Sequence, residues 1–413
     1  MPDPTSDTRR RDLVRRLRQA GHLRDDRVAA AFAAVPRELF LAAHAERHGL
    51  DDVYRDDAIV TRRDPETGRP TSSSSQPAIM ARMLEMLDVG PGDRVLEIGA
   101  GTGYNAALLA HVVGDGGAVT SVELDADVAV DARRALLSAK APARVEVGDG
   151  AAGWPPAAPV DAVVATASVD RIPRTWFDQL RPGGRLVAPL HISPVVTWVQ
   201  AVAALRKVRT GFDTVAVTPG AFMPLRRADD TGRGRAARLV VGEVADGGPG
   251  RSHVELTGPA LAGLDRAARQ RLVMTALGFA RRRPVPLGGG SALGLLAYVA
   301  LALPEERLVE VERSGGPGVR EALGVVDAVD GSLAVLVPEP SGRMRLDAYG
   351  GNRAERGVLS AVERWELAGR PAVADARLTV RYGSVRPHGW HSARRGDQWI
   401  ALDWQRARDA RGG

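Results

Sequence analysis

The stretch RVLEIGAGTGY, residues 94–104, places three glycines directly after a short apolar run. Residues 94–98 have the composition of a strand, and a helix is expected over 106–113. The glycines at 99, 101 and 103 predict a tight turn between them, where a ligand can approach the backbone closely. Alone, this turn is a weak signal, because several adenosine-containing cofactors bind at such turns.

Three acidic positions narrow the choice among NAD, FAD and S-adenosylmethionine. Glu97 ends the first strand, where it would repel a pyrophosphate but could bind the amino-acid portion of S-adenosylmethionine. Glu123 ends the second strand and is placed to bind ribose hydroxyls. Asp149 and Gly150, which follow a third strand, can receive an adenine amino group. The pattern therefore favours S-adenosylmethionine over a dinucleotide.

Strands and helices alternate throughout this part of the chain. Further strands are expected over 118–124, 144–147, 160–166 and 185–188, with helices over 128–139 and 176–180. Such alternation predicts an α/β fold with a doubly wound, mainly parallel sheet. Ligands bind open sheets of this kind at the carboxyl ends of the strands, which is where the three acidic positions lie.

The flanking regions have other textures. Residues 9–48 show apolar spacing typical of helices, and 49–75 are polar and turn-rich. The polar, glycine-rich stretch 227–252 is expected to be a linker, and 253–413 an α+β accessory domain. In that domain, helices are expected near 260–282 and 291–303, and strands near 322–337, 376–382 and 398–402.

Length and composition exclude several classes of protein. A chain of 413 residues with 44% hydrophobic residues can form two or three packed domains. It contains no cysteine, which excludes a disulfide framework, a thiolate zinc site and a cysteine nucleophile. No secretory signal is visible, and the longest apolar run, 292–303, is too short to span a bilayer. We therefore expect a soluble, cytoplasmic protein that does not act on membranes.

Two further site types are disfavoured. The net charge of +6 suggests nucleic-acid binding, but the arginines are spread along the chain and are rarely interleaved with aromatic residues. His44 and His48 have a spacing that can hold a metal on a helix, yet no third ligand is evident. Neither a nucleic-acid partner nor a metal is therefore expected.

Several short motifs, in order, resemble the protein-L-isoaspartate O-methyltransferase family. They are VPRELF (35–40), SQP (75–77), VLEIGAGTGY (95–104), GDG (148–150), LRPGG (180–184) and PL (224–225). The resemblance implies a Rossmann-like class I methyltransferase domain over 1–226. That family transfers a methyl group from S-adenosylmethionine to an abnormal aspartyl carboxylate in a peptide.

The resemblance also assigns residues to roles. Ser75 matches the family's active-site serine, and Ser73 stands where threonine is usual, so both are expected to be catalytic. Ser72, Ser74 and Gln76, in an active-site loop over 61–77, are expected to bind substrate. With the motif, the resemblance implies cofactor binding by Glu97, Gly99, Gly101, Gly103, Tyr104, Glu123, Asp149 and Gly150.

The residues after 226 depart from the usual family pattern. Such an extension resembles an actinobacterial branch associated with ribosomally synthesised, post-translationally modified peptides, including the lanthipeptide, graspetide and lasso classes. The resemblance implies methylation of an ordinary aspartate of a precursor peptide, giving aspartimide or isoaspartate. General isoaspartyl repair is the alternative. A third possibility is a binding module without enzymatic activity. It would require that the glycine turn with Glu97, Glu123 and Asp149 bind no S-adenosylmethionine. The oligomeric state stays open.

Overall fold

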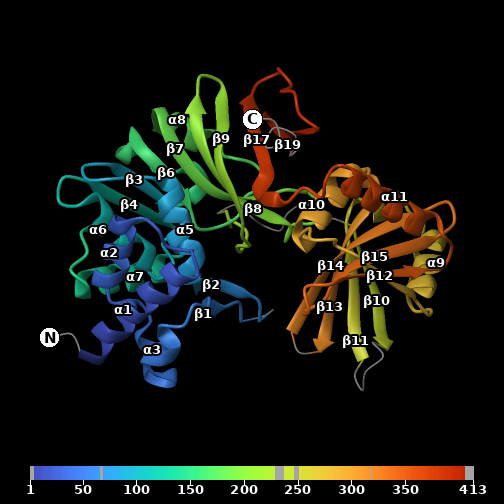
Figure 1. The fold of residues 1–413 in the computed structure, drawn as a ribbon, viewed down its shortest axis with the longest axis horizontal. Coiled ribbons are helices and arrows are strands. Elements are labelled where there is room, and N and C mark those ends of the chain that lie inside the picture. The colour runs from blue at the N-terminus through green and yellow to red at the C-terminus, as the bar shows by residue number, and fades with distance from the viewer. Residues whose placement is uncertain (1–3, 66–67, 228–236, 246–250, 317, 405–413) are drawn as a thin grey trace.

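The structure is a computed structural model that describes residues 4–65, 68–227, 237–245, 251–316 and 318–404. Its strands form a ten-stranded sheet, a seven-stranded sheet and a separate two-stranded hairpin. Figure 1 shows helices on both sides of the first large sheet, with the hairpin β1–β2 projecting from that body toward the second. No helix within the described ranges has the length and apolar character needed to cross a membrane.

The parallel half of the ten-stranded sheet confirms the expected α/β fold. Its strands, in spatial order, are β7 (Leu180–His191), β6 (Val160–Ala165), β3 (Arg94–Ile98), β4 (Ala118–Glu123) and β5 (Ala143–Val147). The chain runs outward from β3 to β5 and then crosses back to β6. The carboxyl end of β3 therefore lies at the topological switch point, where such sheets bind ligands.

Helices bury both faces of this half, and for that reason its central strands are almost wholly apolar. They are α5 (Pro77–Leu87), α6 (Tyr104–Val113), α7 (Ala126–Ser138) and α8 (Arg174–Gln179). The amino-terminal segment adds the expected helices α1 (Pro4–Gln19), α2 (Asp26–Ala34), α3 (Ala42–His48) and the single turn α4 (Leu50–Val53). α5 begins at Pro77, where the missing N–H of proline costs no helical hydrogen bond, and ends at the left-handed Asp88.

The serine run lies in regular structure rather than in a loop. β1 (Ile59–Arg63) and β2 (Pro70–Ser74) form an antiparallel hairpin in which Val60 pairs with Ser73. The expected active-site loop over 61–77 is therefore largely a hairpin. A run of serines has low strand propensity. The backbone hydrogen bonds to β1 therefore stabilise this strand, rather than the preference of its side chains.

The division of the carboxyl-terminal half differs from the expected boundaries. β8 (Gln200–Val208) and β9 (Gly211–Pro219) extend the first sheet in antiparallel fashion. β17 (Ala376–Tyr382) then pairs with β9, followed by β19 (Gln398–Trp404) and β18 (His391–Arg395). The last strands of the expected accessory domain 253–413 thus belong to the ten-stranded sheet, because β9 presents an open edge that they cover.

The second sheet forms the body of the accessory region. Its order is β10 (Arg238–Ala245), β11 (Arg251–Thr257), β13 (Leu308–Gly316), β14 (Gly318–Asp327), β15 (Ser332–Pro338), β16 (Met344–Tyr349) and β12 (Arg281–Val285). β10 lies inside the stretch expected to be a linker. The helix expected near 260–282 is shorter, α9 (Arg266–Ala276), whereas α10 (Ala292–Ala302) matches the expectation. α11 (Arg353–Leu367) packs beside α10.

The two bodies share one apolar core. A single cluster of buried side chains runs from Leu186 and Phe212 in the first sheet through Leu295 and Trp365 to Leu346 in the second. Because this cluster is continuous, the accessory region is packed against the ten-stranded sheet rather than tethered to it. A separate cluster fills the space between α2, α5, α6 and the opposite face of the first sheet.

Candidate active site

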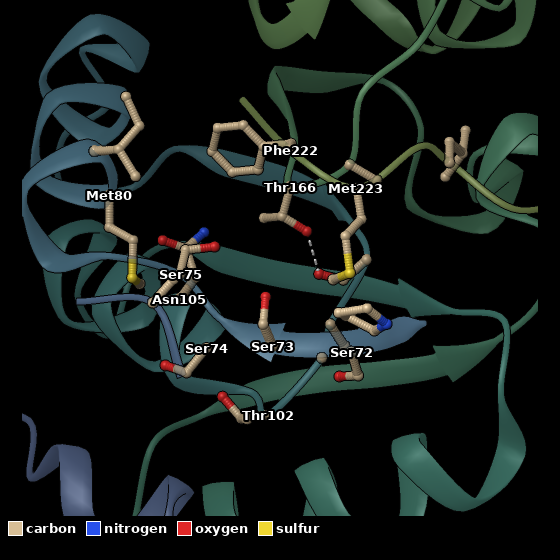
Figure 2. Close-up of a pocket in the computed structure, with 18 of the residues that line it drawn as sticks. Ser72, Ser73, Ser74, Ser75, Met80, Thr102, Asn105, Thr166, Phe222 and Met223 are labelled. Atoms are coloured by element: carbon tan, nitrogen blue, oxygen red, sulfur yellow. Dashed lines mark hydrogen bonds between the residues drawn. The ribbon is translucent and has the colours of Figure 1, made fainter. Parts of the chain in front are cut away.

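A cavity of about 470 Å³ opens at the carboxyl ends of β3 and β4. This volume lies within the range of about 300–1,000 Å³ that is usual for small-molecule sites. Most of its wall comes from residues 70–76 of the hairpin, the glycine turn and the start of α6 without Gly103, residues 122–124 at the end of β4, and 219–226 at the end of β9. Ala58, Val60, Ile79, Met80, Met83, Gly150, Thr166 and Ala167 complete it. Figure 2 shows Ser73, Ser75, Thr166 and Phe222 around this space.

The glycine turn has a left-handed backbone at Gly99 and Gly101, which favours glycine, and at Gly99 an added Cβ would also clash. Gly99 has a φ of 92°, and an added Cβ would lie 2.5 Å from Oγ1 of Thr166. Gly101 has a φ of 51°, and its Cβ would lie 3.5 Å from the carbonyl oxygen of Ser73. The turn therefore packs directly against the serine strand. This contact brings the two predicted sites into one cavity.

Glu123 both lines the cavity and holds the glycine turn. Its carboxylate accepts hydrogen bonds from the backbone N–H of Gly101 at 2.9 Å and of Leu124 at 2.9 Å. The side chain is 8% exposed. A carboxylate so fixed is preorganised to accept hydrogen bonds from ligand hydroxyls at its remaining lone pairs.

Glu97 lies behind the turn and not on the cavity wall. It is fully buried, and its two oxygens accept hydrogen bonds from Nδ2 of Asn105 at 2.7 Å and from Oγ of Ser121 at 2.5 Å. Burial raises the pKa of Glu97 to about 7, against the opposing effect of these two hydrogen bonds. Asn105 does line the cavity. The sequence analysis missed this residue, although it directly follows the glycine motif.

The other expected cofactor residues divide in the same way. Gly150 and Tyr104 line the cavity, whereas Gly103 packs against Ala132 of α7. The carboxylate of Asp149 accepts a hydrogen bond from the N–H of Ala151 at 2.8 Å and lies off the cavity wall. Tyr104 is 1% exposed, and its ring packs against that of Phe40.

The strand geometry sorts the four serines into two pairs. Ser72 and Ser74 are buried, and their hydroxyls contact Thr61 at 3.1 Å and Arg37 at 3.4 Å. Ser73 and Ser75 are only partly buried. All four serines border the cavity, but within the described part of the chain the hydroxyls of Ser73 and Ser75 make no hydrogen bond to the hairpin or its surroundings. Alternation along a strand thus favours Ser73 and Ser75 as the ligand-facing pair.

Arg37 supports this segment from behind. Its side chain is fully buried and donates to the carbonyl oxygens of Val53 at 3.0 Å and Ser75 at 3.1 Å. The acceptors are uncharged, and desolvation lowers the pKa of the guanidinium. Arg37 belongs to the VPRELF motif, so the signal was present in the sequence, but nothing there connected it to the serines.

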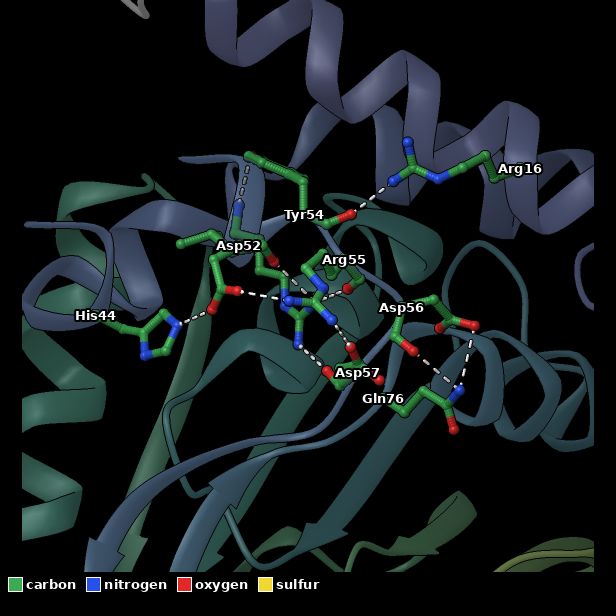
Figure 3. Close-up of polar contacts among 10 residues, drawn as sticks. Arg16, His44, Asp52, Tyr54, Arg55, Asp56, Asp57 and Gln76 are labelled. Carbon is green, nitrogen blue, oxygen red and sulfur yellow. Dashed lines mark hydrogen bonds and ion pairs between the residues drawn. The ribbon is translucent and has the colours of Figure 1, made fainter. Parts of the chain in front are cut away.

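Asp56 fixes the far end of the serine segment. Its carboxylate accepts hydrogen bonds from the N–H of Ala78 at 2.8 Å and from Nε2 of Gln76 at 3.2 Å (Figure 3). Gln76 is therefore held by the scaffold, although it also borders the cavity. Nearby, Nε2 of His44 lies 2.6 Å from the carboxylate of Asp52. The histidine that suggested a metal ligand is thus part of this local polar network.

Comparison with known proteins places this site in context. Residues 8–228 match the family described as Protein-L-isoaspartate(D-aspartate) O-methyltransferase. A Protein-L-isoaspartate O-methyltransferase of Thermotoga maritima is 41% identical over 168 residues, or 40% of this chain and 51% of that protein. The matched region therefore spans about half the length of this relative. The protein of the same name from Ignicoccus hospitalis is 34% identical over 218 residues, covering 52% of this chain and 97% of that protein.

One solved structure resembles both bodies of the fold. It is titled a protein-L-isoaspartate O-methyltransferase, is 25% identical and has a TM-score of 0.52. The likeness covers 96% of this chain and 99% of that chain. It therefore extends far beyond residue 228 into the accessory region.

Proposed function

The chain belongs to the protein-L-isoaspartate O-methyltransferase family, and on this premise we propose that it methylates the free carboxylate of isoaspartyl residues in peptides and proteins. The observation that carries the proposal is the contact between two sites. The glycine turn and the serine strand line one cavity, with the Cβ position of Gly101 only 3.5 Å from the backbone of Ser73. A methyl donor and a carboxylate acceptor bound there would be neighbours.

S-adenosylmethionine is the methyl donor, and the donor set of this cavity suits it. The sulfonium of this cofactor carries an activated methyl group. Residues 99–102 line the cavity, without a side chain at Gly99 and Gly101, and Glu123 supplies a fixed carboxylate for ribose hydroxyls. Asn105 and Gly150 complete the wall on this side. A cationic ligand beside a carboxylate is also electrostatically favourable.

The chain's own residues have to orient the acceptor rather than activate it. A carboxylate with an ordinary pKa near 4 is already ionised at pH 7, so no strong general base is needed. Ser73 and Ser75 can donate their hydroxyl hydrogens to it. Arg37 holds the backbone at Ser75 through the hydrogen bond of 3.1 Å. Rate enhancement of this kind comes from proximity and orientation, which can contribute about 7–11 kcal/mol.

The accessory region does not favour precursor-peptide maturation over this function. Maturation is the interpretation that the sequence analysis prefers over repair, because the residues after 226 depart from the usual family pattern. A solved structure that bears the family's name resembles this chain over 96% of its length. An extension of this kind is therefore compatible with the ordinary family activity.

Two peptides of identical sequence that differ only in isoaspartate or aspartate test the proposal. We expect transfer of a methyl group from S-adenosylmethionine to the isoaspartyl peptide, observed by mass spectrometry as a methyl ester. The adjacent backbone nitrogen then attacks the ester and expels methanol to form a succinimide. Failure to methylate the isoaspartyl peptide, with transfer only to a normal aspartate in one defined peptide, would support maturation instead.

Replacement of Glu123 by glutamine should weaken cofactor binding. The amide keeps the size of the side chain but has only one acceptor oxygen, so the N–H of either Gly101 or Leu124 faces an N–H₂ group instead of an acceptor. Leaving buried donors unpaired costs about 1–3 kcal/mol, so we expect the Kd for S-adenosylmethionine to rise about 10- to 100-fold. Calorimetry measures this, with Glu146→Gln on the neighbouring β5 as control. An unchanged Kd in a folded Glu123→Gln protein would remove Glu123 from the cofactor site.

A further inference from the structure

The stretch 219–226 forms the cavity wall that faces the serine strand. The buried side chain of Gln200 accepts from the N–H of Phe222 at 2.8 Å and donates to its carbonyl at 3.1 Å. Figure 2 shows Phe222 and Met223 across the cavity from Ser73 and Ser75. Ser168 bridges to this wall through its backbone, because its N–H donates to the carbonyl of Met223 at 2.8 Å and its carbonyl accepts from Leu225 at 2.8 Å. The position of Met223 and Leu225 in the wall therefore depends on Ser168, and that of Phe222 also on Gln200.

The side chain of Ser168 adds buried hydrogen bonds to Phe222 in the wall and to His191 at the end of β7. Its hydroxyl donates to the carbonyl of Phe222 at 3.1 Å and lies 3.0 Å from Nε2 of His191. Because a hydroxyl has one hydrogen, the His191 ring is the donor in the second bond. Ser168 is 0% and His191 3% exposed. Water does not compete for these bonds, so they define the geometry locally.

Side chains of the last two strands, β18 and β19, form hydrogen bonds with the backbone of residues 170–172 and 191–192. The guanidinium of Arg395, at the end of β18, donates to the carbonyl oxygens of Asp170 at 2.8 Å, His191 at 2.7 Å and Ile192 at 2.6 Å. Gln398 of β19 is fully buried. Its amide accepts from the N–H of Ile172 at 3.2 Å and donates to the carbonyl of the same residue at 2.7 Å.

These contacts join segments that are distant in the sequence. Residues 168–172 follow β6, and Thr166, directly after the end of β6, lines the cavity. Arg395 and Gln398 satisfy main-chain groups of this segment, and no sheet pairing within the described residues does so at Asp170 or Ile172. A planar guanidinium that donates to three carbonyls fixes their relative positions more rigidly than a single hydrogen bond.

We propose that Arg395 and Gln398 are positioning residues for the methyl-acceptor side of the cavity. Through residues 168–172 and the pair formed by Ser168 and His191, they set where Phe222 and Met223 stand opposite Ser73 and Ser75. The carboxyl-terminal strands are thereby part of the acceptor site. This inference rests on the proposed methyl transfer for its kinetic readout only.

The cofactor side is held by other contacts. Glu123 fixes the glycine turn, and Arg226 at the end of the wall pairs with Asp125 at 2.5 Å. Loss of the Arg395 contacts should therefore act on the acceptor peptide and spare the cofactor. This split between the two ligands separates positioning from general destabilisation, which would weaken both.

Variants Arg395→Met, Arg395→Lys and Ser168→Ala test the proposal, with Arg381→Met as control. Arg381 lies on β17, which is separated from β18 by β19, and donates to the carbonyl of Phe212 at 2.8 Å. We expect Arg395→Met and Ser168→Ala to raise the KM for an isoaspartyl peptide about tenfold, the scale of a small displacement of a binding wall. The Kd for S-adenosylmethionine should stay within about twofold. Arg395→Lys retains a cation that can reach carbonyls, so its KM for the isoaspartyl peptide should lie between those of wild type and Arg395→Met.

Hydrogen exchange supplies a readout that does not depend on turnover. The backbone amides of Ser168 and Leu225 should exchange faster in Arg395→Met and Ser168→Ala and remain protected in Arg381→Met. If Arg395→Met fails to fold, the single-atom change Ser168→Ala decides. An unchanged KM together with unchanged exchange in Ser168→Ala, or equal effects in Arg381→Met, would overturn the proposal. If the wild-type protein methylates no isoaspartyl peptide, the proposed function fails, and the exchange rates still decide whether the strands position the wall.

Discussion

Ser75→Ala should lower the kcat of methyl transfer about 10²-fold, the usual cost of removing one preorganised donor from a reaction site. The reason is that its hydroxyl lies at the cavity and engages no scaffold partner among the described residues, whereas its backbone carbonyl is held by Arg37. The substitution therefore removes a ligand-facing donor and leaves the strand in place. The Kd for S-adenosylmethionine should change by less than about threefold, because Glu123 and the glycine turn are untouched.

Ser74→Ala is the matched control for this substitution. Its hydroxyl is 3% exposed and contacts Arg37, on the side of the strand away from Ser75. We expect a modest loss of stability, about 0.5–1.5 kcal/mol, with kcat near that of wild type. Steady-state kinetics at saturating peptide measure both variants. Wild-type turnover by Ser75→Ala would show that Ser75 does not orient the acceptor.

Glu97→Gln should make the cofactor-free protein more stable above pH 7. The pKa of Glu97 is raised from about 4.5 when unfolded to about 7 when folded. The folded state therefore prefers the protonated carboxyl, and the stability it contributes is complete below pH 4.5 and is lost as the pH rises through 7. At 1.36 kcal/mol for each unit of pKa, this loss is about 3 kcal/mol. Glutamine is uncharged like the protonated carboxyl, so the Glu97→Gln protein does not lose this stability as the pH rises.

Urea unfolding of both proteins between about pH 5 and pH 8.5 tests this prediction. The free energies of unfolding should be similar at the acidic end and diverge as the pH rises, with Glu97→Gln the more stable. Glu310 also has a pKa raised to about 7 by burial, so both proteins share its contribution to the pH dependence. Only the difference between the two curves reports on Glu97. Parallel curves would mean that Glu97 is not protonated in the folded protein near neutral pH.

The sequence was most informative where neighbouring residues in the chain are also neighbours in the fold. The parallel strands, the glycine turn and the acidic residues at the strand ends follow from local periodicity, because each strand is short and is buried by the helices next to it. The same applies to α10, whose apolar run matches its burial. For this reason the cavity and most of its cofactor side could be predicted from the order of the residues.

The acceptor side could not be predicted in the same detail. The alternation of the serines at 72–75 into two engaged and two cavity-facing hydroxyls depends on the pairing of β2 with β1, and serines by themselves have little preference for a strand. The support from Arg37 joins residues that lie 38 positions apart. A motif does not reveal that the Arg37 guanidinium is buried without a carboxylate partner, because its main acceptors are main-chain carbonyls, which every residue carries.

The class of fold, the family and the identity of the methyl donor follow from the sequence alone, since each depends on local patterns and on motifs that need no long-range information. The place of the last strands in space depends instead on the tertiary structure. β17–β19 return to the edge of β9, and Arg395 reaches Asp170 across 225 positions of sequence. An open sheet edge and a set of unpaired carbonyls can be satisfied by many segments of similar composition. Which segment does so is settled by the packing of the whole chain, in which the shared core brings the final strands to that edge.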